Sequence, residues 1–211
     1  VGGVWSESVL QTPVDAPADD AGFGFPVATS GGTVVASTRW RDTERHYNRV
    51  HVYERVGGAW AETARIEDPA TEPPHLDKPS GFGSGVAISG DRLAVASPGQ
   101  DVDGAQDEGL VRIYRREADG WALEATLTNP TGERTSAIGR VLAMDGPLLA
   151  VKANRGVWVY RRTGTSWAFE TELALPEERA GIDRALDVDG DRVAAGAWNA
   201  RDTRGSAYVW A

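Results

Sequence analysis

Short apolar runs, each closed by a glycine turn, recur along the chain. The stretch GFGSGVAISGDRLAVASP at 81–98 holds two such runs, VAI and LAVA, joined by a Gly-Asp turn. Related stretches occupy 22–38, 138–153 and 182–198. Short apolar runs that flank a glycine turn are typical of β-hairpins. The pattern therefore predicts four hairpins, with turns at Gly31-Gly32, Gly90-Asp91, Gly146-Pro147 and Gly190-Asp191.

Each hairpin is followed by two further predicted strands. The third strand of each unit has alternating character, and these strands lie at 49–55, 109–116, 156–162 and 205–211. A fourth strand, marked by a tryptophan near its start, follows the first three units. The marker residues are Trp60, Trp121 and Trp167, and Trp5 marks a similar segment at the N-terminus.

The fourth tryptophan strand, GGVWSESVL at 2–10, stands at the N-terminus and not after 205–211. This circular permutation predicts an all-β fold, a β-propeller of four four-stranded blades. The N-terminal strand would complete the C-terminal blade, close the ring and remove an exposed edge. A β-sandwich of unrelated hairpins is the alternative, but it does not explain the fixed order of the markers.

The repeat sets the expected organisation of the chain. One propeller domain covers 1–211, with blades at about 22–68, 81–129, 137–175, and 181–211 plus 2–12. We expect a monomer, and two chains that join into an eight-bladed ring are the alternative assembly. The recurring tryptophans are expected to pack blades, because every unit requires one.

Composition narrows the classes of partner. The net charge is -9, with 31 acidic and 22 basic residues, so nucleic acid and anionic membrane surfaces are poor partners. The chain has no cysteine, which excludes disulfides, thiolate metal sites and cysteine nucleophiles. No apolar run approaches the ~20 residues that cross a membrane, so no membrane insertion is expected. The N-terminus lacks signal-peptide features, as that of a processed exported protein also would.

Several short motifs resemble a known family. Phe-Gly pairs open the first two units at 23–24 and 82–83. The tripeptides ASP at 96–98 and GAW at 196–198 stand where Gly-Ala-Pro would fall. The chain thus resembles the FG-GAP repeats of integrin α-subunit propellers, and more closely their bacterial form, in the segments VAISGD (86–91) and GSAYVW (205–210). It departs from the motif at Ile138-Gly139 and Ile182-Asp183.

The resemblance implies an extracellular or cell-envelope location and a binding or adhesive role without catalysis. It names no ligand. Integrin propellers have seven blades, so the blade number does not carry over. Their repeats often hold calcium in the first hairpin, but the hairpins of this chain are too short. We therefore interpret Asp187, Asp189 and Asp191 as turn and surface residues.

A longer acidic loop, GQDVDGAQDEG at 99–109, contains Asp101, Asp103 and Asp107 around Gly104. Calcium prefers six to eight oxygen ligands, and glycine allows the tight turn that brings them together. Because carboxylates are few here, a solvated acidic loop is the favoured interpretation. A calcium site formed by these three aspartates is the alternative.

The corresponding loops of the first and last units share a tryptophan followed by Arg-Asp-Thr. Tryptophan faces beside polar groups are typical of sugar binding, since the ring stacks on C–H faces while polar groups bind hydroxyls. The predicted ligand-binding residues are Trp40, Arg41, Tyr47, Trp198 and Asn199. The alternative is that each tryptophan packs against a neighbouring blade.

The sequence gives little support for catalysis. The three histidines, His46, His51 and His75, lie in no nucleophile or metal motif, and no phosphate loop is present. We expect a non-catalytic recognition or adhesion module that binds a protein or a glycan. A carbohydrate-binding lectin and a purely structural scaffold domain are the alternatives.

Overall fold

The computed structural model describes residues 7–10, 22–41, 46–69, 80–132, 137–153, 156–175, 182, 185–197 and 204–211, with the backbone alone at 39–41 and 46–47. All the regular structure in this part of the chain is β-strand. Blade 1 comprises β1 (Gly22–Ser30), β2 (Thr33–Arg41), β3 (His46–Val56) and β4 (Ala59–Glu67). Blade 2 comprises β5 (Val86–Ser89), β6 (Arg92–Ser97), β7 (Leu110–Glu117) and β8 (Gly120–Leu127).

The second half of the chain repeats this plan. Blade 3 comprises β9 (Leu142–Asp145), β10 (Leu148–Lys152), β11 (Gly156–Thr163) and β12 (Ser166–Ala174). Blade 4 comprises β13 (Ala185–Asp189), β14 (Arg192–Ala197) and β15 (Ser206–Trp210). Each blade is an antiparallel meander whose strands pair in chain order. The prediction of an all-β, four-bladed β-propeller is confirmed.

The predicted closing strand falls mostly outside the described residues, which exclude 1–6. Residues 7–10 belong to no described strand, and the fourth sheet has three strands among the described residues. Closure of the ring by the N-terminal strand therefore stays a prediction.

The predicted hairpin turns lie where the sequence places them. The first glycine of each turn has a left-handed backbone, with φ between +53° and +58° at Gly31, Gly90, Gly146 and Gly190. Residues with a Cβ disfavour this region, so glycine at this point allows a two-residue turn between the inner strands.

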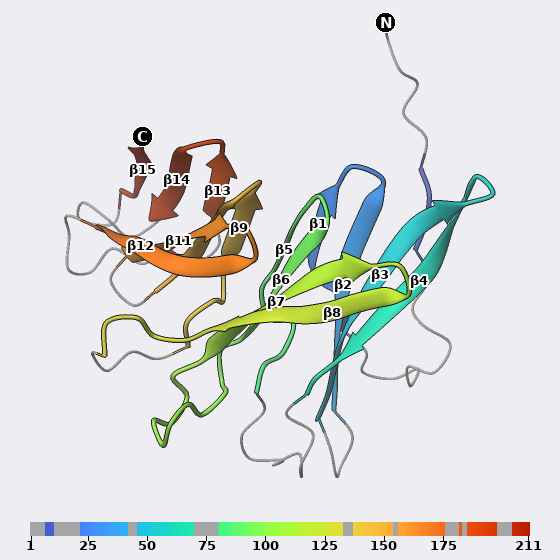
Figure 1. The fold of residues 1–211 in the computed structure, drawn as a ribbon, viewed down its shortest axis with the longest axis horizontal. Coiled ribbons are helices and arrows are strands. Elements are labelled where there is room, and N and C mark those ends of the chain that lie inside the picture. The colour runs from blue at the N-terminus through green and yellow to red at the C-terminus, as the bar shows by residue number, and fades with distance from the viewer. Residues whose placement is uncertain are drawn as a thin grey trace, which may run out of the picture.

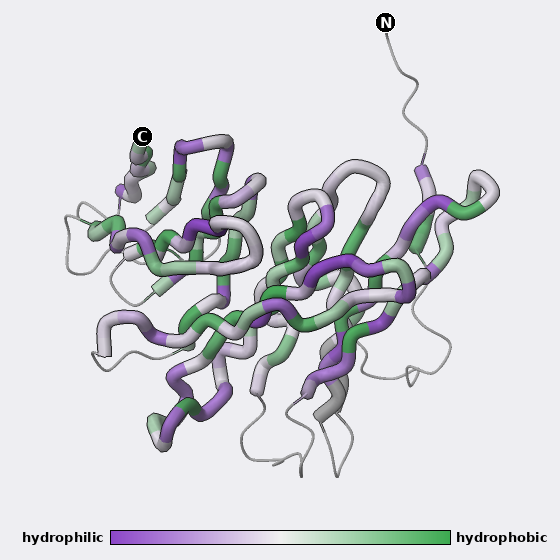
Figure 2. The backbone as a smooth tube through the Cα atoms, in the orientation of Figure 1, coloured by the Kyte–Doolittle hydropathy of each residue, from purple (hydrophilic) through white to green (hydrophobic). Residues whose placement is uncertain are grey.

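The blades fan outward from the inner strands β1, β5, β9 and β13 (Figure 1). Hydrophobic residues concentrate on the inner and second strands, whereas the turns are polar (Figure 2). A strand that is covered on both faces reads as a continuous apolar run, as LAVA does within the second strand β6, whose six residues are all buried.

Three hydrophobic clusters lie between consecutive blades, and we call these contacts seams. Seam 1–2 joins Val35, Val50 and Val52 to Val86, Ile88, Leu93 and Val95. Seam 2–3 joins Ala94, Val111 and Ile113 to Leu142, Leu149 and Val151. Seam 3–4 joins Ala150, Val157 and Val159 to Val188, Val193 and Ala195. Successive residues of a strand point to opposite faces, so the inner strands β5 and β9 each serve two seams.

The residue that opens each of the last three units fills a seam. Phe82, Ile138 and Ile182 are at most 2% exposed and pack in seams 1–2, 2–3 and 3–4 respectively. Isoleucine thus takes the place of phenylalanine at the same position, and the departure from Phe-Gly leaves the packing role intact.

The tryptophan markers of three blades lie at the second residue of β4, β8 and β12. Trp121 packs against seam 1–2 and Trp167 against seam 2–3, as the packing interpretation predicts. Trp5 lies outside the described residues. The described part of the chain contains no helix long and apolar enough to cross a membrane.

Candidate recognition site at the loop end

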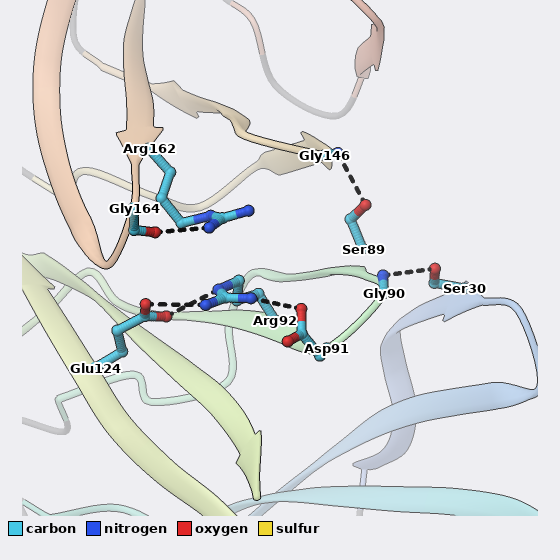
Figure 3. A network of polar contacts seen from close by, with 9 residues as sticks. All are labelled: Ser30, Ser89, Gly90, Asp91, Arg92, Glu124, Gly146, Arg162 and Gly164. Carbon is cyan, nitrogen blue, oxygen red and sulfur yellow. Dashed lines mark hydrogen bonds and ion pairs between the residues drawn. The ribbon is translucent and has the colours of Figure 1, made fainter.

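The hairpin turns of neighbouring blades lie side by side at one end of the propeller. In blades 1, 2 and 3, a side-chain oxygen just before the turn accepts a hydrogen bond from the turn glycine of the next blade, and Figure 3 shows the first two of these bonds. The bonds join Ser30 Oγ to Gly90 N (3.0 Å), Ser89 Oγ to Gly146 N (2.9 Å) and Asp145 Oδ2 to Gly190 N (2.8 Å). We call this the turn end.

The connections between the second and third strands of the blades lie at the opposite end, because the strands are antiparallel and the turns are aligned. We call this the loop end. Its connections differ in length from blade to blade, and they span 42–45, 98–109, 153–155 and 198–205. One scaffold therefore carries four dissimilar loops.

The structure places three of the predicted ligand-binding residues at the tip of the β2–β3 hairpin. The backbone register pairs Trp40 with Tyr47 and Arg41 with His46. Directly paired residues have their Cβ atoms about 5 Å apart on one face of a sheet. Trp198 and Asn199 lie outside the described residues, so their approach to this hairpin stays a prediction.

The acidic loop of blade 2 is ordered by its own hydrogen bonds. Val102 and Ala105 exchange backbone bonds of 3.0 and 2.8 Å. The Asp107 N–H donates to Asp101 Oδ1 at 2.9 Å, and the Asp107 carbonyl accepts from Ala137 N–H at 2.8 Å. The last of these bonds ties the loop to the residues that lead into blade 3.

The exposed carboxylates of this loop are the predicted calcium ligands Asp101, Asp103 and Asp107. Within the described ranges, no three His, Asp or Glu side chains are grouped so that they could hold a metal ion. The structure shows one role for these residues, in which the Asp101 carboxylate caps the Asp107 N–H. Calcium binding by the loop stays a prediction.

The polar seam contacts were not identified from the sequence, although a signal for them is present. The residue before the turn glycine is Ser30, Ser89, Asp145 or Asp189 in the four units. All four carry a side-chain oxygen that can accept a hydrogen bond. Recurrence of such an acceptor beside a turn glycine points to a bond between neighbouring turns.

A second polar contact crosses seam 1–2. The Arg116 guanidinium forms an ion pair with Glu54 and donates to Thr33 Oγ1 at 2.8 Å. It also stacks over Trp121, with 4.8 Å from Cζ to the ring centroid. Burial acts to raise the pKa of Glu54, but the Arg116 guanidinium, together with hydrogen bonds from Thr63 and Thr33, lowers it overall.

His51 is buried in blade 1 with only 1% of its surface exposed. Its Nδ1 lies 3.0 Å from Glu62 Oε1, and Phe23 packs edge-on against its ring. Its Nε2 is buried without a hydrogen-bond partner among the described residues. Burial lowers the pKa of His51 despite the nearby carboxylate, so the ring is neutral and donates from Nδ1.

Glu62 itself is held as a carboxylate. Burial acts to raise its pKa, but hydrogen bonds from Arg65 and His51 lower it overall. Arg65 Nε donates to Glu62 Oε1 at 2.9 Å. His51 lies in β3, and Glu62 and Arg65 lie in β4, so these contacts join the two outer strands of blade 1.

A compact ion pair stabilises the turn of blade 2. Arg92, which is 8% exposed, bridges Asp91 Oδ1 at 2.6 Å and Glu124 Oε2 at 3.0 Å (Figure 3). The hydrogen bond from Arg92 lowers the pKa of Asp91. The two ion pairs of Arg92 link the β5–β6 turn to the outer strand β8.

No protein-family model matches the chain, and no curated protein sequence matches it.

Proposed function

We propose that the chain is a non-catalytic recognition module of the FG-GAP type. It binds a protein or glycan partner through the loop end and works outside the cytoplasm, at the cell envelope or beyond it. One observation supports this assignment above the others: the seams repeat the same contacts from blade to blade, whereas the loops differ in every blade. Dissimilar loops on a repeated rigid scaffold are the usual arrangement of a recognition surface.

A glycan ligand is the sharper form of the proposal. The paired positions of Trp40 and Tyr47 favour it, because the register sets two aromatic residues opposite each other at one hairpin tip, and aromatic rings are the usual stacking groups for sugars. Trp198 and Asn199 would complete the surface from the last blade.

A glycan-array screen of the purified protein, run in calcium and again in EDTA, tests this form. We expect saturable binding to a restricted group of sugars, lost in Trp40→Ala and in Trp198→Ala. Val56→Ala is the matched control, because Val56 is 58% exposed and lies beside a turn at the opposite end. Loss of binding in EDTA would support calcium at Asp101, Asp103 and Asp107. A blank array in both buffers contradicts the glycan form.

The protein-binding form has a separate test. A photo-crosslinking amino acid in place of Tyr47 should capture one extracellular protein reproducibly, and the same group in place of Val56 should not. Equal capture by the two variants, or by neither, would favour a purely structural scaffold.

A further inference from the structure

Each blade has two faces with different roles. Its forward face packs against the next blade in the chain, and its rear face packs against the preceding blade. Two faces have no neighbour among the described residues: the rear face of blade 1 and the forward face of blade 4. The first and last blades stand at the two ends of the fan (Figure 1).

The forward face of blade 4 has the composition of a seam face but is exposed. Val209 occupies the position in blade 4 that Val52, Ile113 and Val159 occupy in blades 1, 2 and 3. Each of these residues lies on the third strand and pairs with the forward-facing residue of the second strand, which is Ala194 in blade 4. These three equivalents are 0%, 0% and 4% exposed, whereas Val209 is 68% exposed. Two neighbours of the equivalent residues are missing around Val209 among the described residues: the covering blade, and a fourth strand beside β15.

The rear face of blade 1 shows the complementary defect. Val27 is 60% exposed, whereas its equivalents Val86 and Leu142 are 6% and 9% exposed. The space around the glycines of the Phe-Gly pairs also shows that this face of blade 1 is uncovered. A Cβ at Gly83 would lie 2.9 Å from Ser37 Oγ of the preceding blade, but a Cβ at Gly24 would meet nothing within 4 Å.

At the turn end, blade 4 has an acceptor side chain and blade 1 has a donor N–H for the bond that joins the other blades. Asp189 occupies the acceptor position of blade 4, and Gly31 occupies the donor position of blade 1. Neither the Asp189 carboxylate nor the Gly31 N–H has a partner among the described residues. Together they would repeat the bond that joins Asp145 to Gly190 at 2.8 Å.

Both free faces carry a polar residue at one position of the inner strand that is apolar in the described seams. At this position each described seam brings an alanine of one blade together with a larger apolar residue of the next: Ala28 with Ile88, Ala87 with Met144, and Ala143 with Val188. On the free faces the positions hold the polar residues Asp187 and Thr29, and the Thr29 hydroxyl donates to the Thr33 carbonyl of its own blade at 2.9 Å. Both free faces thus carry a polar residue at this position, where the described seams are apolar.

We propose that the forward face of blade 4 docks on the rear face of blade 1 in a second copy of this chain. Within one chain the two faces lie at opposite ends of the fan, so a single molecule does not bring them together as it stands. Two chains related by a two-fold axis form two such head-to-tail seams, and the ring of eight blades then closes. The inference does not depend on the proposed recognition function.

Sedimentation of the wild-type chain should give twice the 22.5 kDa of one chain at micromolar concentration. Val209→Glu and Val27→Glu should each be monomeric, because a charge would be buried in the new seam. Both side chains are exposed in one chain, so the substitutions leave its fold intact, which circular dichroism checks. Val56→Glu, equally exposed but on neither face, should remain dimeric. A monomeric wild-type chain overturns the proposal.

Disulfide trapping separates docking of a second copy from closure within one chain. The chain has no cysteine, so each introduced pair reports alone. Ser30→Cys with Gly90→Cys reproduces a seam that exists and should form a bond within one chain. Asp189→Cys with Gly31→Cys should instead give a covalent dimer under oxidation. An intramolecular bond in the second variant, or no bond beside a positive first variant, overturns the proposal.

Discussion

At the scale of single residues, His51 couples folding to pH. The folded ring is neutral and Nε2 has no acceptor, so a second proton is disfavoured. The unfolded side chain binds that proton below its ordinary pKa of about 6.5. Because the unfolded state then holds more protons, the free energy of unfolding should fall as pH decreases through 6.5 and be regained above it. One proton limits the slope to about 1.4 kcal/mol per pH unit.

Chemical denaturation of the wild-type chain and of His51→Leu, from pH 7.5 to 5, measures this effect. The leucine variant should lose the contribution of one titrating group, while His46 and His75 contribute equally to both chains. Parallel pH profiles for the two chains would contradict a neutral buried His51.

At the scale of elements, the Arg116 contact shows how one strand of blade 2 is joined to blade 1. Arg116→Ala removes the ion pair with Glu54, the bond to Thr33 and the stacking on Trp121. We expect a loss of about 1–3 kcal/mol in the free energy of unfolding, since hydrogen bonds to charged groups and cation–π contacts each contribute on this order.

Arg55 is the matched control for that variant. It occupies the same position in blade 1 and lies over Trp60 at 5.4 Å, but it has no preceding blade to contact among the described residues. In the Val27→Glu background, in which a second copy does not cover the rear face of blade 1, Arg55→Ala should therefore cost only about 0.5–1 kcal/mol, the value of an exposed cation–π contact. Equal losses in urea denaturation would mean that the ion pair across the seam contributes nothing.

The strands, the turns and the packing role of the marker tryptophans could be predicted from the sequence, but the hydrogen bonds between blades were not identified. Period-two runs and turn glycines are local signals, so the hairpin around Gly90 and the strand that begins near Trp121 were identifiable. The partner of Ser89 is Gly146, far along the chain, and no local pattern gives that distance. Likewise His51 reads as an ordinary strand residue, because its burial depends on Phe23 folding across it.

The candidate site was predicted only in part, for a related physical reason. The β2–β3 register that pairs Trp40 with Tyr47 follows from the alternation of the two strands. The relation of this hairpin to Trp198 depends on how the first and last blades are placed. That placement is a property of the assembled ring and not of any local segment.

At the scale of the whole molecule, stability should follow the number of seams that each blade makes. Blades 2 and 3 take part in two described seams, whereas blade 4 takes part in one. In repeat proteins the free energy is close to a sum of unit and interface terms, so a terminal unit opens first. Native-state hydrogen exchange should therefore find Val193 and Ala195 less protected than Val95 and Ile113.

Two neighbouring leucines of β10 test this idea, because they face different seams. Leu148 packs in seam 3–4 and Leu149 in seam 2–3, and both are at most 3% exposed. Either substitution by alanine should cost about 2–5 kcal/mol at its own seam. Leu148→Ala should release blade 4 alone, whereas Leu149→Ala should lower the protection of blades 3 and 4 together.

The measurement is best made in a Val27→Glu background, in which a second copy cannot cover blade 4. Uniform loss of protection in all four blades for both variants would show that the propeller unfolds as one unit. In that case the seams would act cooperatively, and the ends of the fan would be no weaker than its centre.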